Sequence, residues 1–263
     1  TPWAWHKKIF QLCKKLNMVC FSTPFNEKAV DFLEKLNVPA YKISSFECTD
    51  FPLIKKIANT GKPTIISTGM CSRKEIQETV TYFKKNSKKK NNLILLKCTS
   101  SYPAKSSDLN LITIQDMKKI FNCEIGFSDH SIGNTASIVA ASLGAVIIEK
   151  HFNINDKVQT PDSHFSGGVK EFSDLVKKLK ETFSAKGKVY YGATNSEKNT
   201  RLARRSIYFV KNIIKGEKIK KDHIKLIRPG LGLEPKYYES IINKKILKNA
   251  KIGQPTSWKF FKK

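Results

Sequence analysis

Short apolar runs alternate with amphipathic stretches through roughly the first two thirds of the chain. Apolar residues recur at helical spacing between the runs, as they do in residues 27–36 and 74–85. Strands that alternate with helices in this way predict βαβ units and a parallel α/β sheet. The runs that we expect to be strands are residues 18–21, 40–43, 64–67, 93–96, 124–127 and 145–148.

Small polar or ionisable residues follow every one of these runs. Both an open doubly wound sheet and a closed (β/α)8 barrel fit the alternation, but an open sheet concentrates its chemistry at one switch point. In a barrel the carboxyl end of every strand reaches the same mouth. The pattern therefore favours a TIM-type (β/α)8 barrel. The chain begins with an amphipathic helix at residues 5–16, so we expect the barrel to lack its first two strands.

The character of the sequence changes after about residue 185. Residues 1–185 form the predicted partial barrel, and residues 186–202 are hydrophilic and are expected to be a linker. Residues 203–263 contain short alternating runs separated by Gly and Pro turns, which predict a small β-rich module. A module of this size buries little core of its own, so we expect it to dock on another surface.

The charge balance is strongly basic, with 48 Lys and Arg against 22 Asp and Glu and a net charge of +26. Arginines are few and the lysines are spread over almost every predicted helix, whereas nucleic-acid proteins cluster charge on one face and use arginine forks. A lysine-rich solvated surface is therefore favoured, with no nucleic-acid partner, and an anionic small substrate fits either interpretation. No apolar run is long enough for a membrane span, so no membrane partner is expected. The six cysteines are isolated, which is typical of a reducing cytoplasm.

Two histidines carry the clearest chemistry. His130 and His151 each stand just beyond a predicted strand, and on adjacent strands of one barrel their imidazoles would face the same mouth. Either histidine taken alone has the alternative of a structural, hydrogen-bonded role. With carboxylates and hydroxyls around them rather than thiolates, a shared hard divalent ion, Mn²⁺ or else Mg²⁺, is favoured over structural zinc.

Carboxylates, lysines and hydroxyls are expected around the two histidines. Any single strand-end carboxylate has the alternative of capping the following helix. Hydroxyls, lysines and helix N-termini together are what binds a phosphate, so a phosphorylated substrate is expected. Lys150 should face away by strand alternation and is interpreted as structural. The ionisable residues expected near the histidines are Glu47, Glu149, Asp129, Asp162, Lys42 and Lys97.

Several motifs in order and in register resemble the sialic acid synthase family. The resemblance covers essentially the whole chain and is closest to pseudaminic acid synthases, although residues 167–169 depart from that pattern. The motifs are Phe21-Ser22-Thr23-Pro24-Phe25, Pro39 to Glu47, Ile66-Ser67-Thr68-Gly69-Met70, Lys97 to Pro103, Gly126 to His130, Glu149-Lys150-His151-Phe152, Pro161 to Ser166, and Arg228 to Tyr238.

The resemblance implies a reaction, a fold and a set of roles. Phosphoenolpyruvate would condense with an N-acetylated amino sugar, 2,4-diacetamido-2,4,6-trideoxy-L-altrose, and water to give pseudaminic acid and phosphate. The C-terminal module would be an antifreeze-like (SAF) domain, swapped between the subunits of a homodimer. His130 and His151 would bind the metal, and Glu47 would be the catalytic carboxylate. Phosphoenolpyruvate would contact Thr23, Lys42, Ser45, Ser67, Ser100 and Ser128, and the sugar would contact Tyr102, Glu149, Asp162 and Arg228.

Two alternatives stay open at this point. Within the family, the chain would be an N-acetylneuraminate or legionaminate synthase. In another class, it would be a catalytically incomplete fragment that binds a sugar or a partner, since without its first two strands the chain is expected to be inactive alone. Phosphate release from phosphoenolpyruvate separates catalysis from binding.

Overall fold

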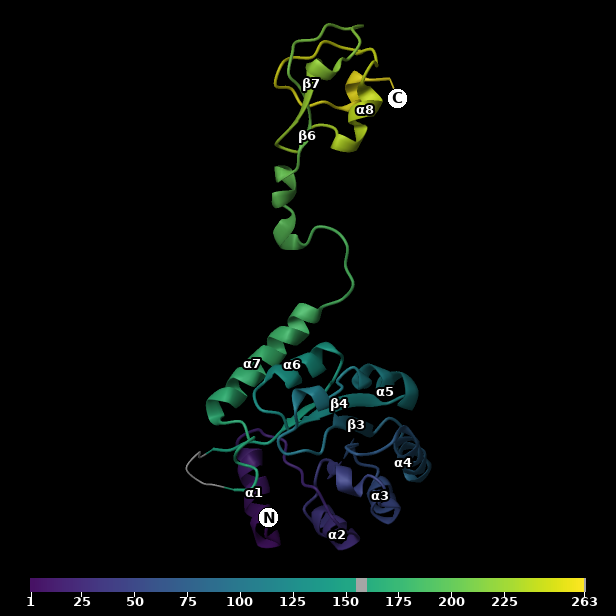
Figure 1. Cartoon of the computed structure of the whole chain (residues 1–263), viewed down its shortest axis with the longest axis vertical. Coiled ribbons are helices and arrows are strands. Elements are labelled where there is room, and N and C mark those ends of the chain that lie inside the picture. The colour runs from purple at the N-terminus through teal and green to yellow at the C-terminus, as the bar shows by residue number, and fades with distance from the viewer. Residues whose placement is uncertain (155–159, 263) are drawn as a thin grey trace. The chain divides into compact units, whose positions relative to one another are not determined.

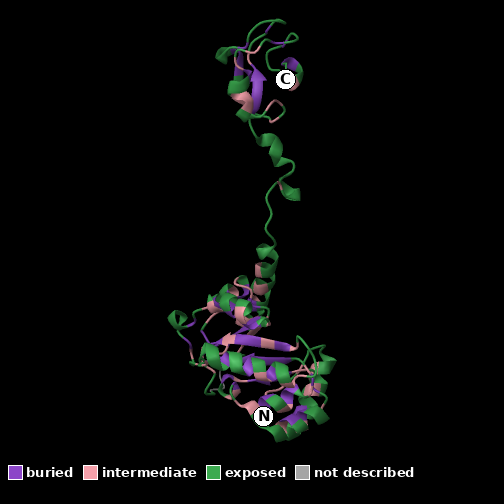
Figure 2. Ribbon diagram, turned by 90° about the vertical axis from the view of Figure 1, so that its right-hand side faces the viewer, coloured by how far each residue is buried: buried purple, intermediate pink, exposed green. Residues whose placement is uncertain are grey.

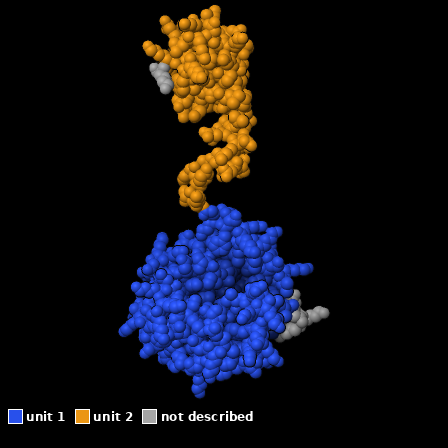
Figure 3. Space-filling view, turned by 180° about the vertical axis from the view of Figure 1, so that it is seen from behind, with its two compact units in different colours: residues 1–187 blue, residues 188–263 orange. Residues whose placement is uncertain are grey.

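The computed structural model describes residues 1–154 and 160–262. The chain divides into two compact units, residues 1–187 and 188–263 (Figure 3). Each unit has its own cluster of buried apolar side chains, so each is described by itself.

A parallel sheet forms the centre of the first unit. Its strands follow one another in chain order, β1-β2-β3-β4-β5, and all four neighbouring pairs are parallel, as the alternation predicted. A sheet of this order places the carboxyl ends of its strands along one rim. The strands are β1 (Tyr41–Ile43), β2 (Thr64–Ser67), β3 (Leu93–Cys98), β4 (Glu124–Asp129) and β5 (Ile148–Lys150).

Helices connect the strands, and α2 to α5 lie in chain order along one side of the sheet (Figure 1). Local sequence signals start several of them. Asn26 caps α2 through Ala29 N, and Ser72 and Glu75 form a reciprocal capping box at the start of α4. The helices of this unit are α1 (Trp3–Lys15), α2 (Glu27–Lys35), α3 (Phe51–Ala58), α4 (Arg73–Asn86), α5 (Thr113–Phe121), α6 (Thr135–Ser142) and α7 (Val169–Lys186).

The prediction of a strand at residues 18–21 is wrong. Within the described residues, only Ser22 pairs with the sheet there, through a single parallel bridge to Tyr41 of β1. Met18 and Val19 are 60% and 77% exposed. A strand needs a continuous ladder and a covered apolar face, and this segment at the free edge of β1 has neither.

The core of the first unit lies between the sheet and its helices. Tyr41, Ile66, Leu95 and Phe127 come from four successive strands and are completely buried. Much of the sheet carries the colour of buried residues in Figure 2. Helices contribute the matching apolar faces, for example Phe83 of α4. Burial on this scale makes the strands a rigid support for the side chains at their ends.

The second unit is a small module of a different kind. Its antiparallel pair is β6 (Ser206–Phe209) and β7 (Ile224–Ile227), followed by the short helix α8 (Tyr238–Ile241). Ile207, Phe209 and Phe260 belong to its own apolar cluster. Across residues 1–154 and 160–262, no helix has both the length and the hydropathy that crossing a membrane requires.

Candidate functional site

The two histidines lie side by side at the rim of the sheet. His130 directly follows β4 and His151 directly follows β5, and their ring centroids are 5.2 Å apart. The rings of Tyr102 and Phe165 complete this group, at 4.3 Å from His130 and 4.9 Å from His151 respectively. We call these four residues the ring cluster.

Each imidazole of the ring cluster is oriented through its Nδ1 atom. His130 Nδ1 lies 3.0 Å from the carbonyl oxygen of Thr99, and His151 Nδ1 lies 3.4 Å from Oδ2 of Asp162. Metal-binding histidines are held in this way, with one ring nitrogen on a carbonyl or carboxylate and the other directed at the ion. These contacts engage Nδ1 of both rings, so Nε2 is the atom of each ring that could hold an ion.

The surroundings shift the pKa values of the two histidines in opposite directions. Burial lowers the pKa of His151, and the neighbouring His130 lowers it further. Burial also acts against protonation of His130, but the Cys98 thiol and the Thr99 carbonyl outweigh it and raise the pKa of that histidine. Because a metal binds neutral imidazole, the lowered pKa of His151 favours its ligand form.

The side chains around the two histidines limit which ion they could hold. In the described parts of the chain, no three or more His, Cys, Asp or Glu side chains are grouped to hold a metal. Two imidazoles beside oxygen donors do not fit a closed structural zinc site, which takes four ligands. An ion held by two imidazoles, with its other positions left to water and substrate oxygen, would have to accept both nitrogen and oxygen ligands, as Mn²⁺ does more readily than Mg²⁺.

A lysine network lies next to the ring cluster. Lys42 Nζ, whose residue is 7% exposed, donates to Ser67 Oγ at 2.7 Å and lies 3.6 Å from Oε2 of Glu149. Ser128 Oγ donates to the other carboxylate oxygen of Glu149 at 2.6 Å. Strands β1, β2, β4 and β5 thus bring four of the predicted residues into one connected set.

Two further hydroxyls converge on Gly69. The amide of Gly69 donates to Ser45 Oγ at 3.0 Å. A Cβ atom at position 69 would lie 2.2 Å from Ser100 Oγ and 2.8 Å from Ser45 Oγ, so the two hydroxyls reach the glycine only because it has no side chain. We call Ser45, Gly69 and Ser100 the hydroxyl cluster.

Cys98 connects the hydroxyl cluster to the histidines. Its Sγ lies 3.8 Å from Ser100 Oγ and 3.9 Å from His130 Nδ1, and the residue is buried. Cys98 is not among the site residues predicted from the sequence. Its place in the strand-end segment Lys97-Cys98-Thr99-Ser100 was a signal, because alternate residues of a strand share a face.

Four predicted residues lie apart from these contacts. Lys97 shares a face of β3 with the buried Leu95, and its Nζ donates to the carbonyl oxygen of Cys98 at 3.0 Å, so its expected place beside the histidines is wrong. Glu47 accepts a short hydrogen bond from Ser44 at the carboxyl end of β1. Thr23 follows the bridge at the edge of β1 and lines a cavity of about 470 Å³ between α1 and α2. Arg228 is exposed at the end of β7 in the second unit.

Asp129 does not face the histidines, so its expected place beside them is wrong. Its carboxylate accepts from Ser137 of α6 and from Lys150, on the other side of the strands. Strand alternation explains this outcome, because Ser128 and His130 take the opposite direction. The same alternation confirms that Lys150 faces away from Glu149 and the site.

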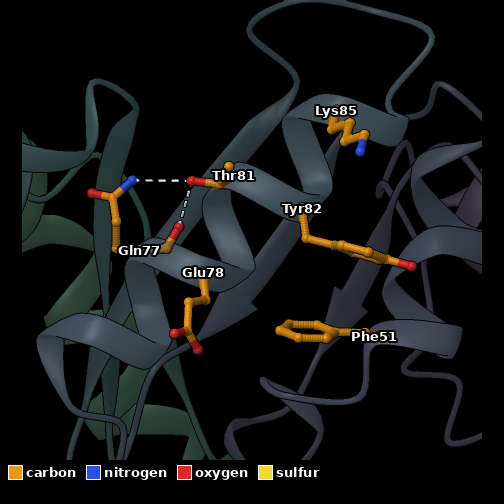
Figure 4. Close-up of a pocket in the computed structure, with 6 residues that line it drawn as sticks. All are labelled: Phe51, Gln77, Glu78, Thr81, Tyr82 and Lys85. Atoms are coloured by element: carbon orange, nitrogen blue, oxygen red, sulfur yellow. Dashed lines mark hydrogen bonds between the residues drawn. The ribbon is translucent and has the colours of Figure 1, made fainter.

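A separate pocket lies on the helices, away from all of these residues. Phe51 and Tyr82 stack with ring centroids 4.8 Å apart, and Gln77 Nε2 donates to Thr81 Oγ1 at 3.2 Å (Figure 4). The pocket, of about 320 Å³, lies along α3 and α4 and holds none of the predicted site residues. It belongs to the outer surface of the unit and not to the rim.

Comparisons with known proteins identify the family of the chain. The family model described as the NeuB family matches residues 1–191, and the SAF domain model matches residues 204–262. The pseudaminic acid synthase of Helicobacter pylori is 41% identical over 261 residues, which are 98% of this chain and 75% of that protein. The N,N'-diacetyllegionaminic acid synthase of Campylobacter jejuni is 37% identical over 247 residues, 94% of this chain and 74% of that protein.

A solved structure gives the same result for the fold. The N-acetylneuraminic acid synthetase of Leptospira borgpetersenii, determined in complex with citrate, superposes with a TM-score of 0.71 at 32% identity. The match covers 76% of this chain and 69% of that one. The parallel sheet with its strand-end residues is therefore half of a TIM-type barrel. The chain belongs to the NeuB family, the sialic acid synthase family that its motifs resemble, and carries a SAF domain.

Proposed function

We propose that the chain is a phosphoenolpyruvate-dependent nonulosonic acid synthase whose product is pseudaminic acid. The observation that carries the proposal is the convergence of the two histidines with the lysine network at one rim of the sheet. The identity to pseudaminic acid synthases supports the choice of product, and 2,4-diacetamido-2,4,6-trideoxy-L-altrose is the matching acceptor sugar.

The lysine network and the hydroxyl cluster would bind the phosphoenolpyruvate. Lys42 is buried and already donates to Ser67, so it provides a fixed positive charge with directed hydrogen bonds. Ser45, Ser100 and Ser128 add hydroxyl donors around it. This arrangement would hold the phosphate and carboxylate so that the methylene carbon faces the sugar.

The ring cluster would hold the acceptor sugar and the ion. Tyr102 and Phe165 form apolar walls against the histidines, and Asp162 and Glu149 are placed to accept from sugar hydroxyls or amides. A divalent ion on Nε2 of His130 and His151 would supply Lewis-acid polarisation of the aldehyde oxygen.

The bonds formed and broken in the condensation define which proton a catalytic carboxylate has to accept. The methylene carbon of phosphoenolpyruvate forms a bond to the aldehyde carbon as the carbonyl π bond breaks, and the aldehyde oxygen becomes an alkoxide that takes up a proton to form a hydroxyl. The neighbouring carbon of phosphoenolpyruvate becomes electron-poor, and water adds to it and gives up a proton. The bond from that carbon to the phosphate oxygen then breaks, and phosphate leaves with the proton of the new hydroxyl to give the keto acid. Glu47, held by Ser44 at the end of β1, would accept the proton of that water.

Substitution of Glu47 tests this assignment. Glu47→Gln is expected to leave Mn²⁺ and phosphoenolpyruvate affinity unchanged while turnover falls about 100-fold or more, since a general base contributes on this order. Phosphate release and the mass of the nine-carbon product are measured with the full-length protein, the acetamido sugar and Mn²⁺, because this chain is expected to be inactive alone. Turnover of the full-length Glu47→Gln variant equal to that of the unsubstituted full-length protein would refute the role of Glu47.

The same assay separates the remaining alternatives. Product with the pseudaminic acid precursor in preference to N-acetylmannosamine supports the proposed sugar, and the reverse preference supports an N-acetylneuraminate synthase. Sugar binding with no release of phosphate would identify a binding fragment. For the homodimer with exchanged SAF domains, which we also propose from the resemblance, Arg228→Ala should lower turnover of a dimer measured by light scattering.

A further inference from the structure

A buried ion pair joins the ends of the two strands that carry the histidines. Asp129 is the last residue of β4 and Lys150 the last of β5, and each directly precedes one histidine. Lys150 Nζ lies 3.1 Å from Oδ2 of Asp129, and both side chains are at most 1% exposed. The two residues are also direct partners in the parallel register of β4 and β5.

Both members of the ion pair make further hydrogen bonds. Asp129 Oδ1 accepts from Ser131 N at 2.8 Å and from Ser131 Oγ at 2.6 Å. Its Oδ2 accepts from Ser137 Oγ of α6 at 2.6 Å, and Lys150 Nζ donates to the Ser131 carbonyl at 2.6 Å. Asp129 and Lys150 therefore hold the amide, hydroxyl and carbonyl groups of Ser131. His130 lies between Asp129 and Ser131, so the backbone on both of its sides is fixed.

Stability alone does not account for such a pair. Removing two charges from water costs several kcal/mol for each ion, and apolar replacements of buried pairs are often neutral or stabilising. What the pair does provide is geometry, because it sets the register of two strand ends and the path of the chain through His130. A ligand pair must be held to within a fraction of an ångström to bind an ion well.

We propose that Asp129 and Lys150 are positioning residues that hold His130 and His151 at the spacing a shared divalent ion needs. They act on the backbone from the side of the strands that faces α6, and they do not touch the ion or the substrate. The inference rests on the proposed function, in that the ligand of the two imidazoles is taken to be a divalent metal.

Mn²⁺ binding to the full chain tests this proposal without reference to turnover. The variant is Asp129→Asn with Lys150→Met, which removes both charges together and leaves no buried ion unpaired. The matched control is Glu34→Gln with Lys62→Met, which removes another pair of the same unit, with a nitrogen–oxygen distance of 2.7 Å, outside the site. Electron paramagnetic resonance gives the affinity for Mn²⁺, and its nitrogen modulation counts the bound imidazoles.

The unsubstituted chain and the control are expected to bind Mn²⁺ through two imidazole nitrogens. The Asp129→Asn, Lys150→Met variant should bind at least about tenfold more weakly, the size of effect seen when outer-shell partners of metal ligands are removed, with the modulation of one imidazole. A folded variant with unchanged affinity and two imidazoles would overturn the inference and leave the metal site intact. No Mn²⁺ binding by the unsubstituted chain would overturn the proposed metal site and the inference with it.

A milder variant covers the case in which the double variant does not fold. Ser137→Ala removes one hydrogen bond to Asp129 and keeps both charges. It is expected to lower Mn²⁺ affinity by about two- to fivefold while circular dichroism shows a folded chain, since a hydrogen bond to a charged group is a modest part of the network. Affinity equal to that of the unsubstituted chain would then overturn the inference.

Discussion

At the scale of single residues, the site depends on what Gly69 lacks. The glycine follows β2 and lets the hydroxyls of Ser45 and Ser100 approach the same point of backbone. Any side chain there must push both hydroxyls away, because each lies closer than a Cβ atom tolerates. Substitution of Gly69 therefore tests the hydroxyl cluster without changing the hydroxyl groups of Ser45 and Ser100.

Gly69→Ala is expected to weaken phosphoenolpyruvate binding about 10- to 100-fold, the loss that follows when one or two hydrogen bonds to a charged ligand are displaced. Affinity is measured by calorimetric titration. Gly253→Ala is the control, since no atom lies within 4 Å of its added Cβ, although its positive φ costs some stability. Equal affinity of the Gly69→Ala variant and the unsubstituted chain would show that the hydroxyls do not bind this ligand.

Residue types could be assigned from the sequence, but their contacts could not. The strand-end positions of Lys42, Ser128 and Glu149 follow from the order of the apolar runs. Their connection does not, because Lys42 on β1 meets Glu149 on β5 only through the curvature of the sheet. Asp129 was misplaced since a carboxylate beside a histidine suggests a shared site, whereas alternation turns the two in opposite directions.

At the scale of elements, a polar link joins α2, β1 and the segment before β2. Tyr41 is fully buried and its hydroxyl donates to Oε1 of Glu34 at 2.6 Å, and Lys62 Nζ donates to the same oxygen at 2.7 Å. Burial favours the protonated form of Glu34, but the hydrogen bonds from Lys62 and Tyr41 outweigh it and lower the pKa of that carboxyl. The link therefore stabilises the packing of α2 on the edge strand in a pH-dependent way.

Because the pKa of Glu34 is lower in the folded chain, the folded state binds fewer protons than the unfolded state near that pKa. Its contribution to stability is therefore complete above the unfolded value of about 4.3 and is lost as the pH falls through the folded value. Glu34→Gln should cost about 1 kcal/mol in the free energy of unfolding by urea at pH 7, and less near pH 3. A cost that is the same at both pH values would contradict the ionic origin of the link.

The runs at residues 40–43, 64–67, 93–96 and 124–127 could be predicted as strands, the edge strand β1 included, whereas β5 begins only at Ile148, the last residue of the run predicted at 145–148. Each of β1 to β5 pairs with at least one neighbour in the sheet. Residues 18–21 have an equally apolar pattern, yet beyond Ser22 they form no ladder with β1 among the described residues. A run of residues shows its own preference for a strand, but not whether a partner strand lies beside it.

At the scale of the molecule, two units with separate cores are joined by an exposed stretch. Tyr190, Tyr191 and Leu202 in this stretch are 59%, 94% and 55% exposed, although such residues are usually buried. The residues between α7 and β6 also contain several lysines and arginines, all of them exposed. Cleavage should therefore begin in this stretch.

Brief digestion with trypsin is expected to cut first between Lys188 and Arg205 and to leave two fragments that resist further cleavage. Exposed backbone outside a packed core is the preferred substrate of a protease. Mass spectrometry of the first products gives the cleavage sites. First cuts within α4 or β4 instead would show that the first unit is less stable than its packing indicates.

The most direct measurement of the central claim is calorimetric titration of phosphoenolpyruvate into the chain in the presence of Mn²⁺. The structure predicts binding at one site per chain, weakened about 10- to 100-fold in Lys42→Met, which removes the buried charge of the lysine network. Lys56→Met, which loses only a surface pair with Asp31, should bind as the unsubstituted chain does. Binding of equal strength in the Lys42→Met variant, or none in the unsubstituted chain, would contradict a phosphoenolpyruvate site at this rim.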